Sequence, residues 1–299
     1  METKRIGSTK IITPVERGVI EFKYTDRWSA FDRGASKQTI PGIGAARCAC
    51  AVKSFERINN AGLSTHFLKQ VSPDAIHVLE FAVPGHEPLS GKVHGQVLDA
   101  EWIRRVLAYG SMLDRLKAGT ATPEQFGFAP GTVVTEGMKL PRMFRECTTK
   151  FEPTDRHLTD VETRERLGIN EAEWEEAWNL IEDVAGVIGS SYEGAGFILP
   201  DGKNELARML DGSFVVVDVT GLQDEDRIID AKTGLLYSKD IIRNHLRQTD
   251  WYPAFLAAKA AHPTDKSKWP PYPMLPDGVV EFVSKQYAEV ARRYAGVRI

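Results

Sequence analysis

The sequence predicts an α+β fold with a β-rich first part and a larger, more helical second part. Short β-rich segments fill most of the first hundred residues, and a single helical pattern interrupts them. Stronger helical patterns begin beyond Gly95. We therefore expect a β-rich N-terminal lobe over residues 1–95 and a larger C-terminal lobe over residues 96–299.

The first part should form a sheet crossed by one helix. Residues 18–25, 64–71 and 75–83 have the alternation or β-rich composition of strands. Between the first two segments, the apolar residues Ala51, Phe55 and Ile58 recur at intervals of four and three. That period predicts a helix over about 45–60 that lies on the sheet.

The second part contains clear helix signals. Asn170 and Glu173 predict a capping box, and the helix that follows keeps its apolar residues on one face through Gly189. Two strands, 196–199 and 213–220, are expected to pair as a hairpin through a polar turn at 211–212. A proline-rich connector near 270–273 should lead to a final helix over about 279–295.

Composition narrows the class of protein. Of 299 residues, 42% are hydrophobic and 26% are charged, which is typical of a water-soluble globular chain. No apolar run approaches the roughly 20 residues of a membrane-spanning helix. The 38 basic and 41 acidic residues give a net charge of −3, so no electrostatic footprint for nucleic acid is expected. We expect small-molecule partners, with no nucleic acid or membrane among them.

The first residues lack the apolar stretch of a secretory signal, and a cytoplasmic location is expected. The three cysteines, Cys48, Cys50 and Cys147, have no metal-ligand spacing and should be ordinary thiols.

Two polar clusters in the first half could form a site. Asp26 and Asp32 follow a predicted strand, ahead of a glycine-rich turn at 39–44. Such residues often line a site, but an ordinary loop capped by aspartates explains them equally well. Arg104 and Arg105 precede Gly110–Ser111, and this combination suits a phosphate monoester.

Two further clusters follow. Residues 148–157 include Lys150, Asp155 and His157, either as part of a site or as a solvated loop. A hairpin would bring Glu205 near Asp218, which would create a hard oxygen site suited to Mg²⁺. Taken alone, the metal interpretation of this pair is the weaker one.

In this order, the clusters resemble the SAICAR synthetase family, and the resemblance runs through nearly the whole chain. The motifs that carry it are G-S-T-K at 7–10, D-R-W-S-A-F-D at 26–32, I-P-G-I-G at 40–44, E-W-I-R-R to G-S at 101–111, G-M-K-L-P at 137–141, T-T-K at 148–150, D-G-K-N-E at 201–205 and K-D-I-I-R at 239–243. The resemblance implies a two-lobed α+β fold with the site in the cleft. It also implies a ligase that joins aspartate to carboxyaminoimidazole ribotide through an acyl phosphate, at the expense of ATP.

The resemblance also implies roles for particular residues. Gly7, Ser8 and Lys10 fall at the turn that binds the phosphates of ATP, and Glu205 and Asp218 fall where Mg²⁺ is bound. Arg105 and Ser111 would bind the ribotide phosphate. The remaining positions complete the substrate site (Arg227, Lys239, Arg243) and the catalytic set (Lys10, Asp32, Lys150, Lys203).

Several residues depart from the family pattern, mostly in the nucleotide half. Ser8 and Ile43 replace lysines, Val219 replaces an acid, and Ala207 replaces a glycine. Residues 221–227 form a segment one residue longer than usual. Weak ATP binding is therefore expected, since each lysine near a triphosphate offsets charge.

Two other readings stay open at this stage. One is a diverged paralogue in specialised nucleoside biosynthesis that acts on another azole or amine, with or without ATP. The other is a non-catalytic protein that binds a nucleotide-like ligand. The sequence leaves the azole, the amine and the oligomeric state open, a homo-oligomer included.

Overall fold

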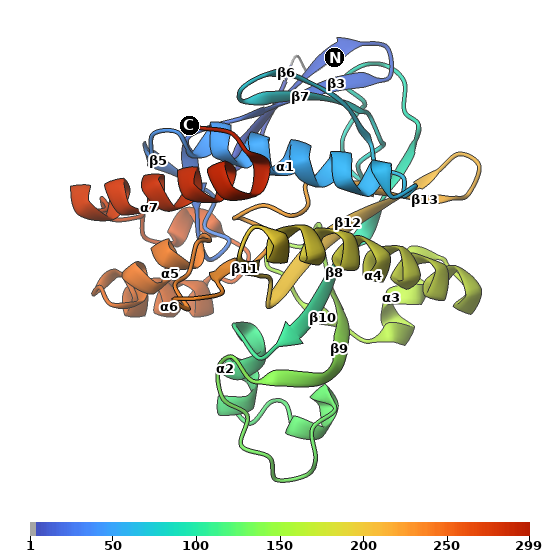
Figure 1. Cartoon of the computed structure of the whole chain (residues 1–299). Helices are drawn as coiled ribbons and strands as arrows, with labels where there is room; N and C mark the ends of the chain where they lie inside the picture. Colours follow the sequence, from blue (N-terminus) through green and yellow to red (C-terminus); the bar gives the residue numbers. More distant parts are fainter. Residues whose placement is uncertain (1–3) are drawn as a thin grey trace.

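The computed structural model describes residues 4–299 and shows an α+β fold built on two antiparallel sheets (Figure 1). The predicted fold class is confirmed. The first sheet lies at the top of Figure 1, and the second runs from the centre down to α2. The first sheet is formed within residues 5–79, and the second begins at Gly95.

The first sheet has five strands in the order β1-β2-β3-β7-β6. Their bounds are β1 Arg5–Ile6, β2 Lys10–Glu16, β3 Val19–Tyr24, β6 Phe67–Ser72 and β7 Ala75–Leu79. The predicted strands at 18–25, 64–71 and 75–83 correspond to β3, β6 and β7. A small separate hairpin, β4 Arg27–Ser29 with β5 Ala35–Thr39, follows β3.

Helix α1, Ile43–Asn60, crosses this sheet as predicted. The carboxylate of Asp26 caps the start of this helix from outside it, because it accepts hydrogen bonds from the backbone amides of Gly42 and Gly44 at 3.2 and 2.9 Å. Gly44 must be glycine, since a Cβ there would lie 2.9 Å from the backbone carbon of Thr25. For Asp26, the reading as a capping aspartate is therefore the right one.

The second sheet has the order β10-β9-β8-β12-β13. Its strands are β8 Gly95–Leu107, β9 Lys139–Thr148, β10 His157–Leu158, β12 Asp201–Met209 and β13 Phe214–Val217. One face packs on helix α4, Glu171–Gly194, where the ring of Trp102 from β8 lies 5.1 Å from Trp174 and 5.0 Å from Trp178. The other face carries the site described below, and the sheet also contributes Val97, Ala207, Val215 and Val217 to a separate apolar cluster.

Helix α4 begins with the predicted capping box, in which Asn170 and Glu173 each bond the other's backbone amide. It continues five residues beyond the predicted end at Gly189. A shorter helix, α3 Asp160–Leu167, precedes it and begins at Thr159, whose hydroxyl accepts from the amide of Glu162.

The remaining helices lie at the bottom and at the left of Figure 1. They are α2 Ser111–Lys117, α5 Asp240–Arg247, α6 Trp251–Ala261 and α7 Asp277–Val290, with short 3₁₀ turns at Pro123–Phe126 and Lys266–Lys268. Helix α7 corresponds to the predicted final helix, and its last part, Ala291–Ala295, is a π-helical turn. The proline-rich connector is ordered, because the hydroxyl of Tyr272 binds the backbone of Ala30 and Gly34.

The predicted hairpin of 196–199 with 213–220 is wrong. The first of these segments, β11 Phe197–Ile198, pairs with β14 Ile229–Asp230, and β13 pairs instead with β12. The first half of β12 carries polar residues on both faces, since Asn204 is buried against Thr220 while Lys203 faces the cleft. That pattern hides the strand from an analysis based on alternation. The true hairpin still sets Glu205 opposite Val217, next to Asp218.

One apolar core joins the two sheets. Helix α1 packs against β3, β6 and β7 on one side and against α4 and α7 on the other. Its buried residues belong to a single cluster with those of the second sheet. Cys48, Cys50 and Cys147 are buried free thiols, in agreement with their reading as ordinary residues. Within residues 4–299, no helix is both long and apolar enough to cross a membrane.

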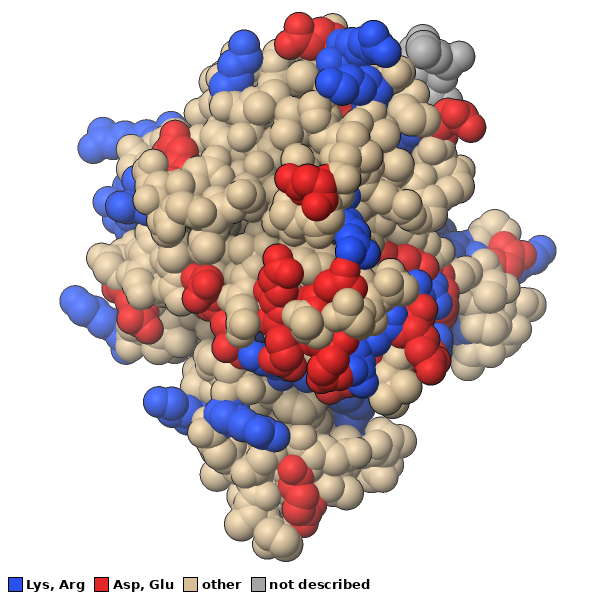
Figure 2. All heavy atoms as spheres, turned by 90° about the vertical axis from the view of Figure 1, so that its right-hand side faces the viewer, with Lys and Arg blue, Asp and Glu red and all other residues tan. Residues whose placement is uncertain are grey.

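Charges of both signs alternate on the surface. On the face shown in Figure 2, acidic and basic side chains lie next to one another over the middle of the molecule. Arg166, for example, pairs with both Asp99 and Glu152. Such partly exposed pairs contribute at most about 1 kcal/mol each, and the fold depends far more on the core.

Candidate active site

A cavity of about 710 Å³ opens on the polar face of the second sheet. Its walls come from β8, β12, the loop after β13, α5 and α6, and the first part of the chain contributes Phe31 and Asp32. Both of these residues adopt left-handed backbone angles, with φ of 54° and 59°, a strain that often marks functional sites. Seven predicted site residues line this cavity: Asp32, Arg105, Ser111, Lys203, Arg227, Lys239 and Arg243.

Strand register explains why these side chains meet. In the antiparallel pair of β8 and β12, Asp201 lies opposite Arg105, Lys203 opposite Ile103, and Glu205 opposite Glu101. Alternate residues of a strand share a face, so these positions form one polar surface. Strand β9 extends it with Glu146 and Thr148, which lie opposite Ile103 and Glu101.

Arg105 and Ser111 form one end of the surface. The guanidinium of Arg105 donates from Nη2 to the hydroxyl of Ser111 at 3.0 Å. It also binds Glu146 at 2.7 Å and Asp201 at 2.8 Å, and it is almost fully buried. These two carboxylates fix the position of the guanidinium and balance its charge.

Arg227 joins Arg105 at this end. Its Nη1 donates to both oxygens of Asp201, at 2.6 and 2.7 Å, so that one carboxylate orients both guanidinium groups. The side chain also lies against Gly110, where a Cβ would come within 2.9 Å of its Nη2 atom. Two arginines, one hydroxyl and a glycine turn thus converge, which is the donor set that a phosphate group prefers.

Asp240 connects Arg227 to the start of α5. It lies 3.3 Å from Nε of Arg227 and 3.5 Å from Arg243. Burial would raise the pKa of Asp240, but Arg227, Arg243 and Lys239 outweigh it and lower the pKa to about 2. Lys239 is half-buried close by, and its desolvation lowers its pKa from the ordinary value. The predicted substrate residues at 239 and 243 therefore belong to the same network.

Lys203 occupies the middle of the surface between two carboxylates. Its ammonium lies 2.7 Å from Glu101 and 3.1 Å from Glu225. Burial raises the pKa of Glu101. Burial would also raise the pKa of Glu225, yet Lys203 and Lys239 outweigh it and lower the pKa to about 2.

The predicted metal residues lie at the far end of the surface, beside the cavity lining rather than in it. Glu205 pairs with Lys150, and Asp218 pairs with Lys10 at 2.5 Å. Burial raises the pKa of Glu205 above its usual range. Among residues 4–299, no group of three or more His, Cys, Asp or Glu side chains is arranged to bind a metal ion. The predicted metal site thus consists of two carboxylates, Glu205 and Asp218, and each forms an ion pair with a lysine.

Gly7 and Ser8 also lie outside the cavity lining. They form the turn between β1 and β2, and the carbonyl of Gly7 accepts a hydrogen bond from Arg27 at 2.9 Å. Ser8 is exposed. Lys10, two residues later, is the part of this motif that reaches the carboxylates.

Sequence reasoning missed the acidic partners of the cationic residues. Glu101 and Glu146 lie on β8 and β9 and pair with Lys203 and Arg105. Glu225 is the second partner of Lys203, and Asp201 and Asp240 pair with Arg227. The spacing of residues 101, 103 and 105, and of 201, 203 and 205, is the signal that could have found the surface. Asp155 and His157 also line the cavity, which favours the site interpretation of their cluster.

Comparison with known proteins identifies the family. The SAICAR synthetase family pattern matches residues 5–255. The phosphoribosylaminoimidazole-succinocarboxamide synthase of Thermoplasma acidophilum is 30% identical over 280 residues, which cover 92% of each chain. The corresponding protein of Nitrosopumilus maritimus is 26% identical over 99% of each chain. The chain belongs to the SAICAR synthetase family.

Solved structures share the fold. A type-2 SAICAR synthetase in complex with ADP matches 99% of both chains, with a TM-score of 0.71 and 20% identity. The SAICAR synthase of Saccharomyces cerevisiae, complexed with SAICAR, matches with a TM-score of 0.73 and 17% identity over 99% of this chain and 95% of its own. Membership of the SAICAR synthetase family makes this chain a ligase that forms a carbon–nitrogen bond, in a family of purine biosynthesis.

The departures from the SAICAR synthetase pattern fall into two groups. Ile43 and Ala207 are fully buried and Val219 is 5% exposed, so these residues pack in the apolar core. Ser8 alone among the four substitutions is exposed to solvent. A charged side chain could be accommodated at position 8 without loss of packing, but not at position 43.

Proposed function

We propose that this protein is an ATP-dependent ligase that joins the carboxylate of an azole ribotide, of the carboxyaminoimidazole ribotide type, to the amine of aspartate or a similar amino acid. The observation that carries the proposal is the convergence of Arg105, Ser111 and Arg227 at one end of a single polar surface. Lys203 and the Lys10–Asp218 pair lie along the same surface. In this proposal, the N-terminal lobe ends near Gly95 and the cavity lies in the cleft.

The ribotide phosphate would bind between Arg105, Ser111 and Arg227. A phosphate dianion requires several donors, and these residues present guanidinium and hydroxyl groups whose positions are fixed by Asp201 and Glu146. The azole would then extend along the strands toward Lys203. Lys239 and Arg243 are suited to the carboxylates of the amino acid, because they line the same cavity from α5.

The nucleotide would occupy the end formed by Lys10, Lys150, Glu205 and Asp218. Two carboxylates fit Mg²⁺, because this ion is commonly bound by one or two carboxylates, with water and substrate phosphates completing the coordination. When bound, Mg²⁺ would neutralise charge on the phosphates. Without Mg²⁺, Lys10 and Lys150 form ion pairs with these carboxylates. Once Mg²⁺ binds the carboxylates, the two ammonium groups would be free to bind the triphosphate.

The reaction would proceed in two displacements. A carboxylate oxygen of the azole attacks the γ-phosphorus, the bond to the β-phosphate oxygen breaks, and ADP leaves. The amine then attacks the carbonyl carbon of the acyl phosphate, and the carbon–oxygen bond breaks with release of phosphate. Lys203, flanked by Glu101 and Glu225, would stabilise the phosphoryl group during transfer. Asp32 faces the cavity from the other lobe and could accept the proton of the amine.

The test is direct. The protein is incubated with ATP, Mg²⁺, carboxyaminoimidazole ribotide and aspartate, and ADP and the succinocarboxamide product are measured. Formation of both in equal amounts supports the proposal. The alternative, a diverged paralogue that acts on another azole or amine, is favoured by the buried Ile43, which removes a cation from the nucleotide half. That alternative predicts no product with aspartate, but ADP release or product with another amine or azole.

A further inference from the structure

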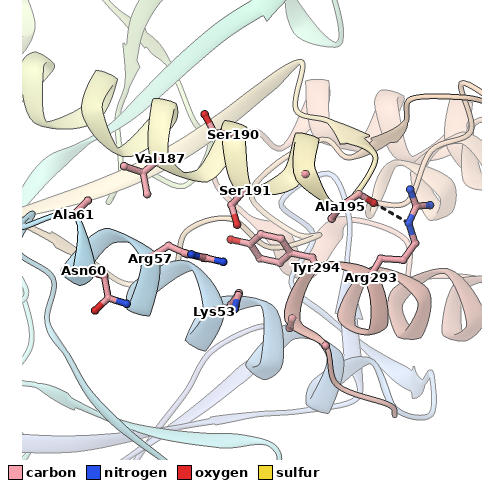
Figure 3. A pocket seen from close by; sticks show the side chains of 13 residues that line it. Lys53, Arg57, Asn60, Ala61, Val187, Ser190, Ser191, Ala195, Arg293 and Tyr294 are labelled. Atoms are coloured by element: carbon pink, nitrogen blue, oxygen red, sulfur yellow. Dashed lines mark hydrogen bonds between the residues drawn. The ribbon is translucent and has the colours of Figure 1, made fainter.

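A second cavity, of about 750 Å³, lies away from the cleft and shares no lining residue with it. It is open to solvent and is lined by the C-terminal half of α1, the end of α4 and the π-helical turn Ala291–Ala295 (Figure 3). Nothing in the proposed reaction uses this cavity. Its size is within the range typical of small-molecule sites, and π-helical turns occur often at functional positions.

The lining has an unusual charge balance. Among residues 4–299, it contains Lys53, Arg57 and Arg293 and no aspartate or glutamate, although the chain as a whole carries a net charge of −3. Arg293 is already bound, because it donates to Asp230 at 2.6 Å and to the carbonyl of Ala195 at 3.0 Å. Within residues 4–299, the side chains of Lys53 and Arg57 have neither an ion pair nor a hydrogen bond to another residue. Two cations thus face the cavity without partners.

These two cations lie one turn apart on α1, where like charges repel each other. Arg57 is in the last turn of the helix, and one cation there offsets the partial negative charge of the helix end. Lys53 is a turn earlier and adds positive charge that the helix end does not require. An anion between them would remove the repulsion and use both charges.

The rest of the lining suits an organic phosphate. Figure 3 shows Arg57 and Ser191 pointing toward the hydroxyl of Tyr294, and Asn60 offers a further amide donor. Val187 and Ala61 provide apolar surface. The volume is far larger than a single phosphate ion occupies, so the charged donors would bind the phosphate while the apolar wall contacts the organic part.

A series of hydrogen bonds leads from Tyr294, in the wall of this cavity, to a segment that lines the cleft. The hydroxyl of Tyr294 lies 2.9 Å from that of Ser54, and Ser54 donates to the carbonyl of Gly221 at 3.1 Å. Tyr192, which stacks on Tyr294, donates to the same carbonyl at 2.8 Å. Gly221 begins the segment 221–227, whose last five residues line the catalytic cavity.

We propose that this cavity is a second anion site, which binds a phosphate-bearing small molecule and restrains the segment 221–227 through Tyr294, Ser54 and Gly221. The backbone of Gly221 packs directly on Ser54, since a Cβ at this position would lie 2.3 Å from Ser54 Oγ. A ligand that fixes Tyr294 would therefore fix the start of the segment.

Binding is tested with ribose 5-phosphate by calorimetric titration, with ribose as the matched ligand without phosphate. The variant K53Q/R57Q removes both charges from the cavity and leaves the cleft unchanged. Its matched control, R17Q/K69Q, removes two exposed charges that line neither cavity. We expect a binding step that K53Q/R57Q weakens roughly tenfold or more and that the control keeps. Identical titrations of wild type and K53Q/R57Q would overturn the proposal.

The connection to the cleft is tested by hydrogen exchange, which needs no catalytic activity. Ribose 5-phosphate should slow exchange in peptides that cover 53–61, 187–196 and 219–227 of the wild type. In K53Q/R57Q, ribose 5-phosphate should no longer slow hydrogen exchange in 53–61 and 187–196, and it should slow exchange in 219–227 less than in the wild type. Equal slowing of 219–227 in both proteins would place the effect in the cleft and refute the restraint. Both tests measure binding and hydrogen exchange, so their outcome does not depend on whether the proposed ligase activity is found.

Discussion

The ammonium of Lys10 lies 2.5 Å from the carboxylate of Asp218, although 208 residues separate them in the chain. This pair connects β2 of the first sheet to the end of β13 in the second. Asp218 adopts a left-handed backbone with φ of 62°, which is uncommon for a residue with a side chain. Burial would raise the pKa of Asp218, but Lys10 and Lys150 outweigh it and hold the pKa well below the usual range.

Asp218→Asn should weaken Mg²⁺-dependent nucleotide binding, because it removes one of the two carboxylates suited to the cation and leaves Lys10 without its partner. We expect the Kd of an ATP analogue with Mg²⁺ to rise about tenfold or more. Asp211→Asn, in the exposed turn of the same hairpin, is the control and should bind as the wild type does. Unchanged affinity and unchanged metal dependence in Asp218→Asn would remove the proposed metal site.

Ser111→Ala tests the phosphate end of the surface. The substitution removes one donor but leaves Arg105 bound to Glu146 and Asp201, so the fold should be preserved. The Kd of the phosphorylated ribotide should rise roughly fivefold to tenfold, whereas the affinity for the corresponding nucleoside should stay the same. Calorimetric titration with both ligands distinguishes these effects. Equal affinities of wild type for nucleoside and nucleotide would contradict a phosphate site here.

Arg105→Ala should have two effects. Loss of the guanidinium should cost about 2 to 5 kcal/mol in affinity for the phosphorylated ligand, or roughly 30-fold to several thousand-fold. It should also destabilise the fold, because Glu146 and Asp201 would be left with fewer cationic partners in a buried region. The unfolding midpoint of this variant should fall, while that of Ser111→Ala should not. A stable Arg105→Ala protein with full affinity would refute both roles.

The sequence predicts the helices more completely than the site. Helices α1 and α4 follow from apolar period and capping residues, since both signals are local. The polar surface depends on register between strands distant in sequence: Arg105 meets Glu146 after 41 residues and Asp201 after 96. No local pattern fixes such a pairing. Strand β12 escapes detection because its first residues are polar on both faces, and a site on a sheet removes the alternation by which strands are recognised.

Glu225 should make stability dependent on acid pH. Its pKa is about 2 in the folded chain, compared with an ordinary value of 4.5, because Lys203 and Lys239 outweigh its burial. A depressed carboxyl pKa stabilises the fold fully above about pH 4.5, and this contribution is lost as the pH falls toward 2. Urea unfolding should therefore show a difference between wild type and Glu225→Gln that shrinks by about 3 kcal/mol from pH 7 to pH 2. Glu16→Gln, an exposed control, should follow the wild-type curve. A constant difference would contradict the role of Glu225.

The last prediction concerns the two positions where lysines of the family pattern are missing. Ile43 is fully buried at the start of α1. Ile43→Lys would bury an ammonium without a partner, and we expect it to destabilise the fold by about 3 to 5 kcal/mol. Thermal unfolding checks this, and an unchanged midpoint would show that the side chain can reach solvent.

Ser8→Lys should instead be tolerated and should bind ATP more tightly. Ser8 is exposed in the turn before Lys10, so a lysine there adds a cation near the proposed triphosphate site without disturbing the core. The gain should be about 1 to 2 kcal/mol, or roughly 5- to 30-fold in Kd. Calorimetric titration of wild type and Ser8→Lys with a non-hydrolysable ATP analogue measures it, with Ser213→Lys as an exposed control on the β12–β13 turn. Tight binding by wild type that Ser8→Lys does not improve would mean that other residues already supply the charge, and absence of binding by both proteins would favour an activity that no longer uses ATP.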